Sequence, residues 1–124
     1  MPDQSVISIV DDDDSVRASL DSLVRSLGFT AYSFPSADAF LQSPRLGDTK
    51  CVISDVQMPN MTGLELQNVM LAQGLRIPII FITAFPDEAL EAAAMKAGAI
   101  AFLNKPFDGQ VMIECLQKAV APEP

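Results

Sequence analysis

The chain has 124 residues, the length of one ordinary domain, and with 49% hydrophobic and 19% charged residues it is too apolar for a disordered protein. Sixteen acidic and eight basic side chains give a formal net charge of −8, and the basic residues are scattered, so direct nucleic-acid binding is not expected. Histidine is absent, which excludes histidine metal ligands and histidine-based catalytic dyads.

The spacing of the two cysteines and the lack of long apolar runs favour the reducing cytoplasm as the cellular compartment. Cys51 and Cys115 lie far apart, without metal-site or CxxC spacing, and are expected to be small buried hydrophobes. No apolar run approaches the ~20 residues of a membrane span, and the N-terminus lacks a signal-peptide pattern. We therefore expect a protein of the reducing cytoplasm that has no membrane partner.

Short apolar runs typical of buried strands alternate with longer stretches of helical spacing. In chain order, the pattern predicts a strand at 6–10, a helix at 16–27, a strand at 30–34, a short helix at 37–41, a loop at 43–50, a strand at 51–54, a helix at 64–73, a strand at 79–82, a helix at 86–97, a strand at 100–103 and a last helix that includes 111–119. Ser36 and Asp108 are the expected N-caps of two of these helices. Residues 1–120 are thus expected to form one domain, followed at 121–124 by a tail or the start of a linker.

Five strands alternating with five helices predict an α/β fold with a doubly wound parallel sheet, because parallel strands need crossovers and the crossovers are helical. In such sheets ligands bind beyond the carboxyl ends of the strands, where the winding direction reverses. A strand order of 2-1-3-4-5 would make the first and third strands neighbours.

Polar side chains that suit phosphate chemistry follow four of the predicted strands. They are Asp11 and Asp12 after the first strand, Asp55 after the third, Thr83 after the fourth and Lys105 after the fifth. Clustered carboxylates repel one another and favour a bound cation, and all-oxygen ligation favours Mg²⁺, with Mn²⁺ as a possible substitute. A lysine and a hydroxyl are suited to bind phosphoryl oxygens. The set is typical of an aspartyl-phosphate site.

Each of these residues also has an ordinary structural interpretation when it is taken alone. The aspartates at 11–14 suit a solvated turn and helix cap, Asp55 and Lys105 suit turns, Thr83 suits a strand and Phe102 suits a core. Their shared placement at one edge of the predicted sheet favours a functional site over separate coincidences.

The sequence resembles the response-regulator receiver domain of two-component signalling over about residues 5–120. The resemblance is carried by the acidic turn at 10–13, the segment 54–63 with the pattern D-x-x-M-P-x-M-x-G, the Thr-Ala pair at 83–84 and the Lys-Pro turn at 105–106. The stretch 34–41 is similar to the FixJ-like subgroup. This resemblance implies a CheY-like, flavodoxin-like fold.

The resemblance also implies roles for individual residues. Asp55 is the implied phosphoacceptor, supplied by a histidine kinase or a small phosphodonor, while Lys105 and Thr83 bind the phosphoryl oxygens. Mg²⁺ is held by Asp12, Asp55 and the backbone carbonyl of Gln57, with Asp11 acting directly or through water. The bond between Lys105 and Pro106 is expected to be cis.

Phosphorylation is implied to act as a switch. Thr83 moves inward, and Phe102 turns from exposed to buried, which alters the face formed by the fourth helix and fifth strand. That face is expected to form a homodimer or to contact an output partner, and a C-terminal DNA-binding domain outside this chain is one such partner. The protein is thus expected to be a self-phosphorylating and slowly self-dephosphorylating switch rather than an enzyme.

One residue and one loop depart from the family pattern. Phe102 lacks the hydroxyl that a tyrosine would bring, so its switching would depend on packing alone. Phe85 and Pro86 follow the switch threonine closely, and a proline there restricts the loop.

Three other functions compete with this interpretation. A haloacid-dehalogenase-type phosphatase would carry an acid two positions after its nucleophile, where this chain has Gln57. Flavodoxin-like cofactor binding would place a hydroxyl- and glycine-rich loop where the aspartates stand. The alternative kept open is a pseudo-receiver, a protein-binding module without phosphorylation, although such a module would ordinarily have lost one of the acids.

Overall fold

A five-stranded sheet forms the centre of the fold in the computed structural model, which describes residues 5–121. In chain order the elements are β1 (Val6–Val10), α1 (Asp14–Ser26), β2 (Thr30–Phe34), α2 (Ala37–Leu41), the 3-10 turn η1 (Leu46–Asp48), β3 (Thr49–Asp55), α3 (Gly63–Ala72), β4 (Ile79–Thr83), α4 (Glu88–Lys96), β5 (Ala101–Asn104) and α5 (Gly109–Val120). Residues 122–124 of the predicted tail lie outside the described residues, so the boundary between domain and tail stays a prediction.

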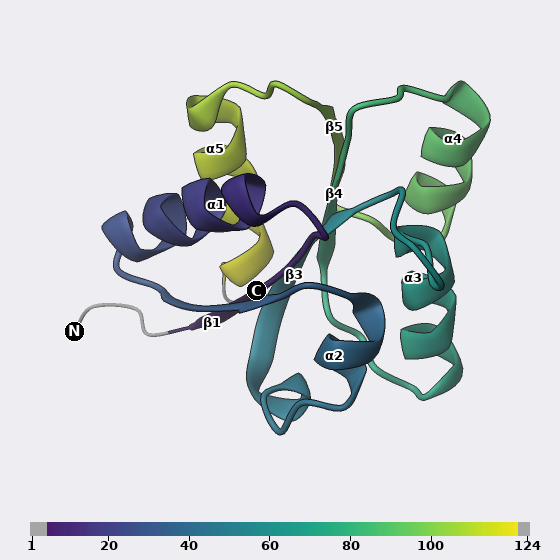
Figure 1. The fold of residues 1–124 in the computed structure, drawn as a ribbon, viewed down its shortest axis with the longest axis horizontal. Coiled ribbons are helices and arrows are strands. Elements are labelled where there is room, and N and C mark those ends of the chain that lie inside the picture. The colour runs from purple at the N-terminus through teal and green to yellow at the C-terminus, as the bar shows by residue number, and fades with distance from the viewer. Residues whose placement is uncertain (1–4, 122–124) are drawn as a thin grey trace.

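All four strand pairs are parallel, and the strand order is β2-β1-β3-β4-β5. Helices α1 and α5 cover one face of the sheet, and α2, α3 and α4 cover the other (Figure 1). The predicted doubly wound α/β fold is therefore confirmed. Among residues 5–121 no helix has the length and apolarity needed to cross a membrane.

The two faces of the sheet carry separate cores. Alternate residues of the central strands, such as Ile7 and Ile9, pack beneath α1 and α5 with Leu20 and Met112. The core on the opposite face contains the buried side chains of α2, α3 and α4, among them Phe40, Leu66, Met70 and Ala94. Burial on both faces explains why the strands are almost continuously apolar in sequence.

Side-chain caps define where the helices begin. Ser36 caps α2 and Asp108 caps α5, which confirms the two predicted N-caps. Thr62 and Glu65 form a reciprocal capping box, so α3 begins at Gly63. Asp87 accepts hydrogen bonds from Ala89 and Leu90, and α4 therefore begins after it.

The central strands are longer than their apolar runs. The ladder pairs Asp55 with Ile82 and Thr83 with Asn104, so both polar residues close their strands instead of following them. Backbone hydrogen bonding continues past the last apolar side chain, which the hydrophobic pattern does not report. As a result, both side chains are held by a rigid sheet rather than by a loop.

The cysteines differ in their surroundings. Both are free thiols; Cys51 is fully buried as predicted, whereas Cys115 on α5 is only partly buried. Burial raises the pKa of the Cys51 thiol to about 12, which makes it an inert core residue.

Gly63 stands where no side chain fits, and Gly63→Ala is predicted to lower the free energy of unfolding by ~1–3 kcal/mol. A Cβ there would lie 2.4 Å from the backbone oxygen of Asp55 and 2.9 Å from the Phe81 ring. Urea unfolding of the variant measures the loss. The control Gly109→Ala, also at a first helical position but with open space for a Cβ, should change stability by less than ~1 kcal/mol. Equal effects of the two substitutions would contradict the packing argument.

Candidate functional site

Three carboxylates meet at the carboxyl ends of β1 and β3. Oxygens of Asp11, Asp12 and Asp55 all lie within 4.8 Å of one another. They come together because β1 and β3 are neighbours, with Val10 in register with Ser54. Asp11 is fully buried and Asp55 almost so, whereas Asp12 is exposed. Two of the acids are therefore fixed by the sheet, and the third faces solvent.

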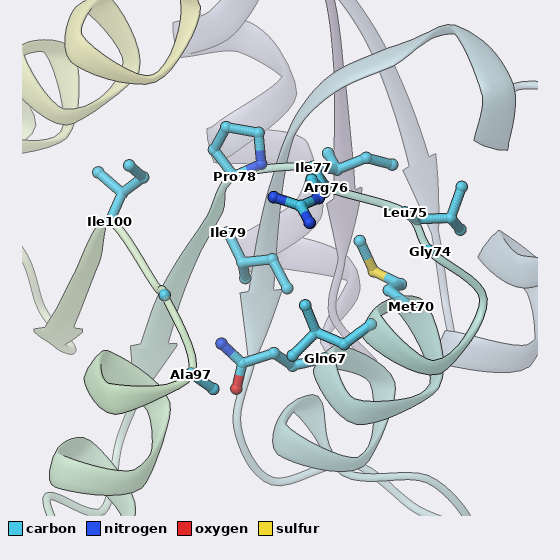
Figure 2. Close-up of a pocket in the computed structure, with 12 residues that line it drawn as sticks. Gln67, Met70, Gly74, Leu75, Arg76, Ile77, Pro78, Ile79, Ala97 and Ile100 are labelled. Atoms are coloured by element: carbon cyan, nitrogen blue, oxygen red, sulfur yellow. The ribbon is translucent and has the colours of Figure 1, made fainter.

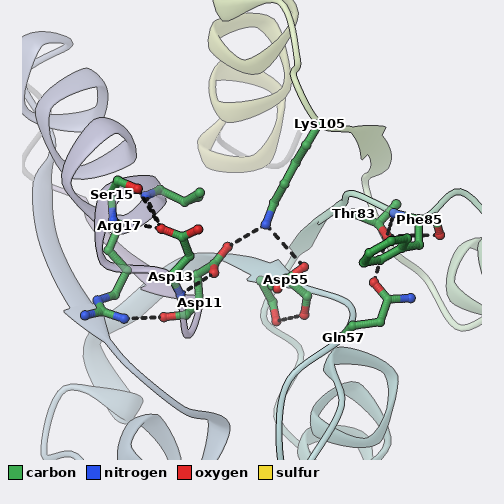
Figure 3. Close-up of polar contacts among 11 residues, drawn as sticks. Asp11, Asp13, Ser15, Arg17, Asp55, Gln57, Thr83, Phe85 and Lys105 are labelled. Atoms are coloured by element: carbon green, nitrogen blue, oxygen red, sulfur yellow. Dashed lines mark hydrogen bonds and ion pairs between the residues drawn. The ribbon is translucent and has the colours of Figure 1, made fainter.

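Lys105 extends from the end of β5 to the two buried acids (Figure 3). Its Nζ lies 3.1 Å from an Asp11 carboxylate oxygen and 3.5 Å from one of Asp55. The backbone amide of Lys105 donates to the carbonyl oxygen of Thr83 at 2.7 Å, which ties the turn to β4. The bond between Lys105 and Pro106 is cis, as the family resemblance implied.

The charges at this edge are unbalanced. Burial, followed by the neighbouring charge of Asp11, raises the pKa of Asp55 from 3.8 to about 6, although the charge of Lys105 opposes the rise. Burial also acts against the Lys105 ammonium, but its hydrogen bond to Asp11 and the charges of both acids outweigh this and raise its pKa. One ammonium faces three carboxylates, so the net negative charge of the cluster favours the binding of a further cation.

Asp11 is held by several partners besides Lys105. One of its carboxylate oxygens accepts a hydrogen bond from the backbone amide of Asp13 at 2.8 Å. Its carbonyl oxygen accepts one from the Arg17 guanidinium at 2.6 Å. Asp13 in turn caps α1. The acidic run thus supplies both a helix cap and two carboxylates of the acidic cluster, so the interpretation as a helix cap does not exclude a functional one.

Thr83 is fully buried at the end of β4, and its hydroxyl is already engaged. Its Oγ1 lies 2.8 Å from the side-chain oxygen of Gln57 and accepts a hydrogen bond from the backbone amide of Phe85 at 3.0 Å (Figure 3). Sequence reasoning assigned a role only to the backbone carbonyl of Gln57. The side-chain contact joins residues 26 positions apart, and no spacing signal in the sequence indicates it.

Phe102 lies beside this region and is already partly buried. It pairs with Phe81 across β4 and β5, with ring centroids 6.1 Å apart. The expectation that Phe102 begins exposed is therefore wrong for this structure, because the ring rests on the core of the α2, α3 and α4 face. The aromatic side chain that is largely exposed is instead that of Phe85 in the β4–α4 loop, with 70% of its surface accessible.

A hollow of about 390 Å³ lies over the acidic cluster, lined by Asp12, Asp13, Asp55, Gln57, Ala84, Phe85 and Lys105. A second hollow of about 500 Å³ lies near the amino end of β4, between the ends of α3 and α4 (Figure 2). Its lining is mainly aliphatic, with Gln67 and Arg76 as polar members. The convergent charged groups lie at the first hollow, which is the better candidate for phosphate chemistry.

The chain matches the response regulator receiver domain model over residues 7–117, and it belongs to that family. It is 44% identical to the response regulator protein TmoT of Ectopseudomonas mendocina over 98% of this chain and 55% of that protein. It is 38% identical to the transcriptional regulatory protein FixJ of Azorhizobium caulinodans over 97% of this chain and 57% of that protein. The chain thus spans about half the length of the curated relatives it matches.

Solved structures agree with this assignment. A crystal structure of FixJ-N superposes with a TM-score of 0.85 at 36% identity, covering 100% of this chain and 98% of that one. A structure of the response regulator StyR gives a TM-score of 0.88 at 42% identity, covering 95% of this chain and 60% of that one. The similarity to FixJ that residues 34–41 suggested is therefore confirmed.

Asp55→Asn is predicted to stabilise the metal-free protein, more at high pH than at low pH. Because the pKa of Asp55 is raised to about 6, folding favours its protonated form, and its charge opposes folding above that pH. At about pH 8 the free energy of unfolding of the variant should exceed that of wild type by ~1–2 kcal/mol, after allowance for solvent screening. The difference should shrink as the pH falls from about 7 to about 4.

Urea unfolding in the presence of a chelator, at several pH values, measures this difference. The exposed Asp38→Asn is the control, with changes expected within about 0.5 kcal/mol throughout. If the stability difference between Asp55→Asn and wild type did not change with pH, folding would not disfavour the ionised form of Asp55, and the argument would be contradicted.

Proposed function

We propose that this domain is a phosphorylation switch in which Asp55 accepts a phosphoryl group from a phosphohistidine of a partner histidine kinase. The observation that carries the proposal is the nearly buried Asp55 carboxylate, which lies beside Lys105 within a cluster of two further acids. A carboxylate oxygen attacks phosphorus, the bond between phosphorus and the histidine nitrogen breaks, and an acyl phosphate forms. The released imidazole takes up a proton from water.

The residues at the edge fit a divalent cation, because three oxygen donors converge there without nitrogen or sulfur ligands. Asp12, Asp55 and the Gln57 backbone carbonyl would hold Mg²⁺, with Mn²⁺ as a substitute. The Asp11 carboxylate accepts hydrogen bonds from Lys105 and from the Asp13 amide. It would contact the ion directly or through water. Bound Mg²⁺ would neutralise the charge that collects on the phosphoryl oxygens during transfer.

Lys105 and Thr83 are the proposed phosphoryl-binding side chains of this chain. The Lys105 ammonium already contacts the Asp55 carboxylate, and after phosphorylation it would contact the negatively charged phosphoryl oxygens. The Thr83 hydroxyl would leave Gln57 and donate to the same group. Thr83 ends β4 and Lys105 directly follows the neighbouring strand β5, so the sheet positions both side chains. Positioning and charge neutralisation are the proposed main contributions of the protein.

The output is proposed to pass through α4 and β5. Movement of Thr83 would shift the loop at Phe85 and the packing of Phe102 on Phe81, and so alter the face that forms a homodimer or contacts an output domain. Relatives of about twice the length include proteins named transcriptional regulatory protein. We therefore propose a cytoplasmic regulator in which a C-terminal DNA-binding domain receives the signal.

Two of the alternative functions fit the geometry less well. A pseudo-receiver would ordinarily have lost one of the acids, whereas Asp11, Asp12, Asp55 and Lys105 lie together at this edge. A haloacid-dehalogenase-type phosphatase needs a free acid two positions after the nucleophile, but the side chain there is a carboxamide engaged by Thr83.

Incubation with acetyl phosphate and Mg²⁺ is predicted to add one phosphoryl group to the wild-type chain, and Asp55→Asn should abolish the addition because its amide is not a nucleophile. Mass spectrometry of the intact protein measures the adduct. The exposed Asp48→Asn is the matched control and should be modified as fully as wild type. An adduct that persists in Asp55→Asn would place the acceptor elsewhere and overturn the proposal.

A further inference from the structure

Gln57 makes a side-chain contact that phosphoryl transfer itself does not require. It follows Asp55 by two residues and directs its carboxamide oxygen at Thr83, 2.8 Å from the hydroxyl oxygen (Figure 3). The same hydroxyl accepts a hydrogen bond from the backbone amide of Phe85 at 3.0 Å. Gln57 and the β4–α4 loop therefore hold the hydroxyl between them.

A threonine hydroxyl has a single proton to donate. In this structure that proton has two acceptors within reach, the Gln57 oxygen at 2.8 Å and the more distant Phe85 carbonyl at 3.2 Å. Because Thr83 is fully buried, its hydroxyl depends on these protein partners rather than on water. A phosphoryl oxygen on Asp55 can receive the same proton only if the bond to Gln57 is given up.

The part of the β4–α4 loop around Phe85 is exposed to solvent. The Phe85 side chain is 70% exposed, and the neighbouring residues 84–88 are exposed as well. Among residues 5–121, the side-chain hydrogen bonds that link this part of the loop to β4 are those between Phe85 and the Thr83 hydroxyl. If the Thr83 hydroxyl moved toward Asp55, both bonds to Phe85 would be lost and this part of the loop would be released.

We propose that Gln57 is a positioning residue, whose carboxamide holds the Thr83 hydroxyl away from Asp55 in the resting state and competes with the phosphoryl group for it. The inference rests on the proposed function and deepens it. The backbone of Gln57 is proposed to bind the cation while its side chain restrains the switch, so one residue acts on both. Its side chain therefore sets how readily the phosphorylated form switches.

Gln57→Met tests the proposal, because methionine keeps the length of the side chain and removes the strong acceptor. The probe is beryllofluoride with Mg²⁺, a stable analogue of a phosphoryl group on a carboxylate. Without the competing acceptor, affinity for the probe is expected to rise by roughly two- to tenfold, the range of one net hydrogen bond. Titration followed by backbone amide NMR signals measures the affinity, and Gln57→Ala is a second variant expected to act in the same direction.

The Thr83→Val background separates this competition from any direct effect of residue 57 on the probe. When the hydroxyl is absent, Gln57→Met should leave the affinity unchanged, because there is no proton to compete for. The exposed Gln73→Met is the matched control in the wild-type background and should also leave the affinity unchanged.

The possible outcomes separate the two proposals. If the wild-type chain does not bind beryllofluoride, the proposed function falls and this inference falls with it. If wild type binds but Gln57→Met shows equal or weaker affinity, only the competition is overturned. An increase of the same size in the Thr83→Val background likewise overturns it, because the effect would not pass through the hydroxyl.

Discussion

The ion pairs between Lys105 and the two buried acids organise the whole edge of the sheet. Lys105 Nζ lies 3.1 Å from Asp11 and 3.5 Å from Asp55, and so holds together carboxylates that would otherwise repel one another. A single ammonium does not neutralise three acids, and the pKa of Asp55 remains raised to about 6. This excess of negative charge is the basis for the proposed binding of a cation and for the proposed phosphorylation of Asp55.

The parallel sheet converts separate sequence segments into this arrangement. Because β1, β3, β4 and β5 end at the same edge, Asp55 and Thr83 are held by ladder pairing and Lys105 by its backbone bond to β4. Gly63 adds a further constraint, since α3 approaches the Asp55 backbone too closely for any side chain. The helices and cores thus fix the position of Asp55, whereas the β4–α4 loop carries the exposed Phe85.

Much of this follows from sequence, and the exceptions have physical causes. The alternation of strands and helices follows from hydrophobic period, and the placement of Asp11, Asp12, Asp55 and Lys105 follows from the ends of the predicted strands. The strand order that groups them is implied by the resemblance to receiver domains and not by hydrophobic period. The T-x-x-E pattern of Thr62 and Glu65 forms a capping box, and it starts α3 at Gly63, one residue before the apolar period begins. The partly buried state of Phe102 and the bond between Gln57 and Thr83 depend on tertiary packing across strands and loops, which local patterns do not encode.

Calorimetric titration of the wild-type chain with Mg²⁺ tests the central claim most directly, namely that the three clustered acids form a cation site beside Lys105. We expect saturable binding of one ion per chain, with affinity that weakens as the pH falls through about 6, because protons and the ion compete for Asp55. Asp12→Asn, which removes the exposed acid and leaves the buried ion pairs, should weaken binding at least roughly tenfold. An absence of saturable uptake, or equal affinity in wild type and Asp12→Asn, would contradict the account.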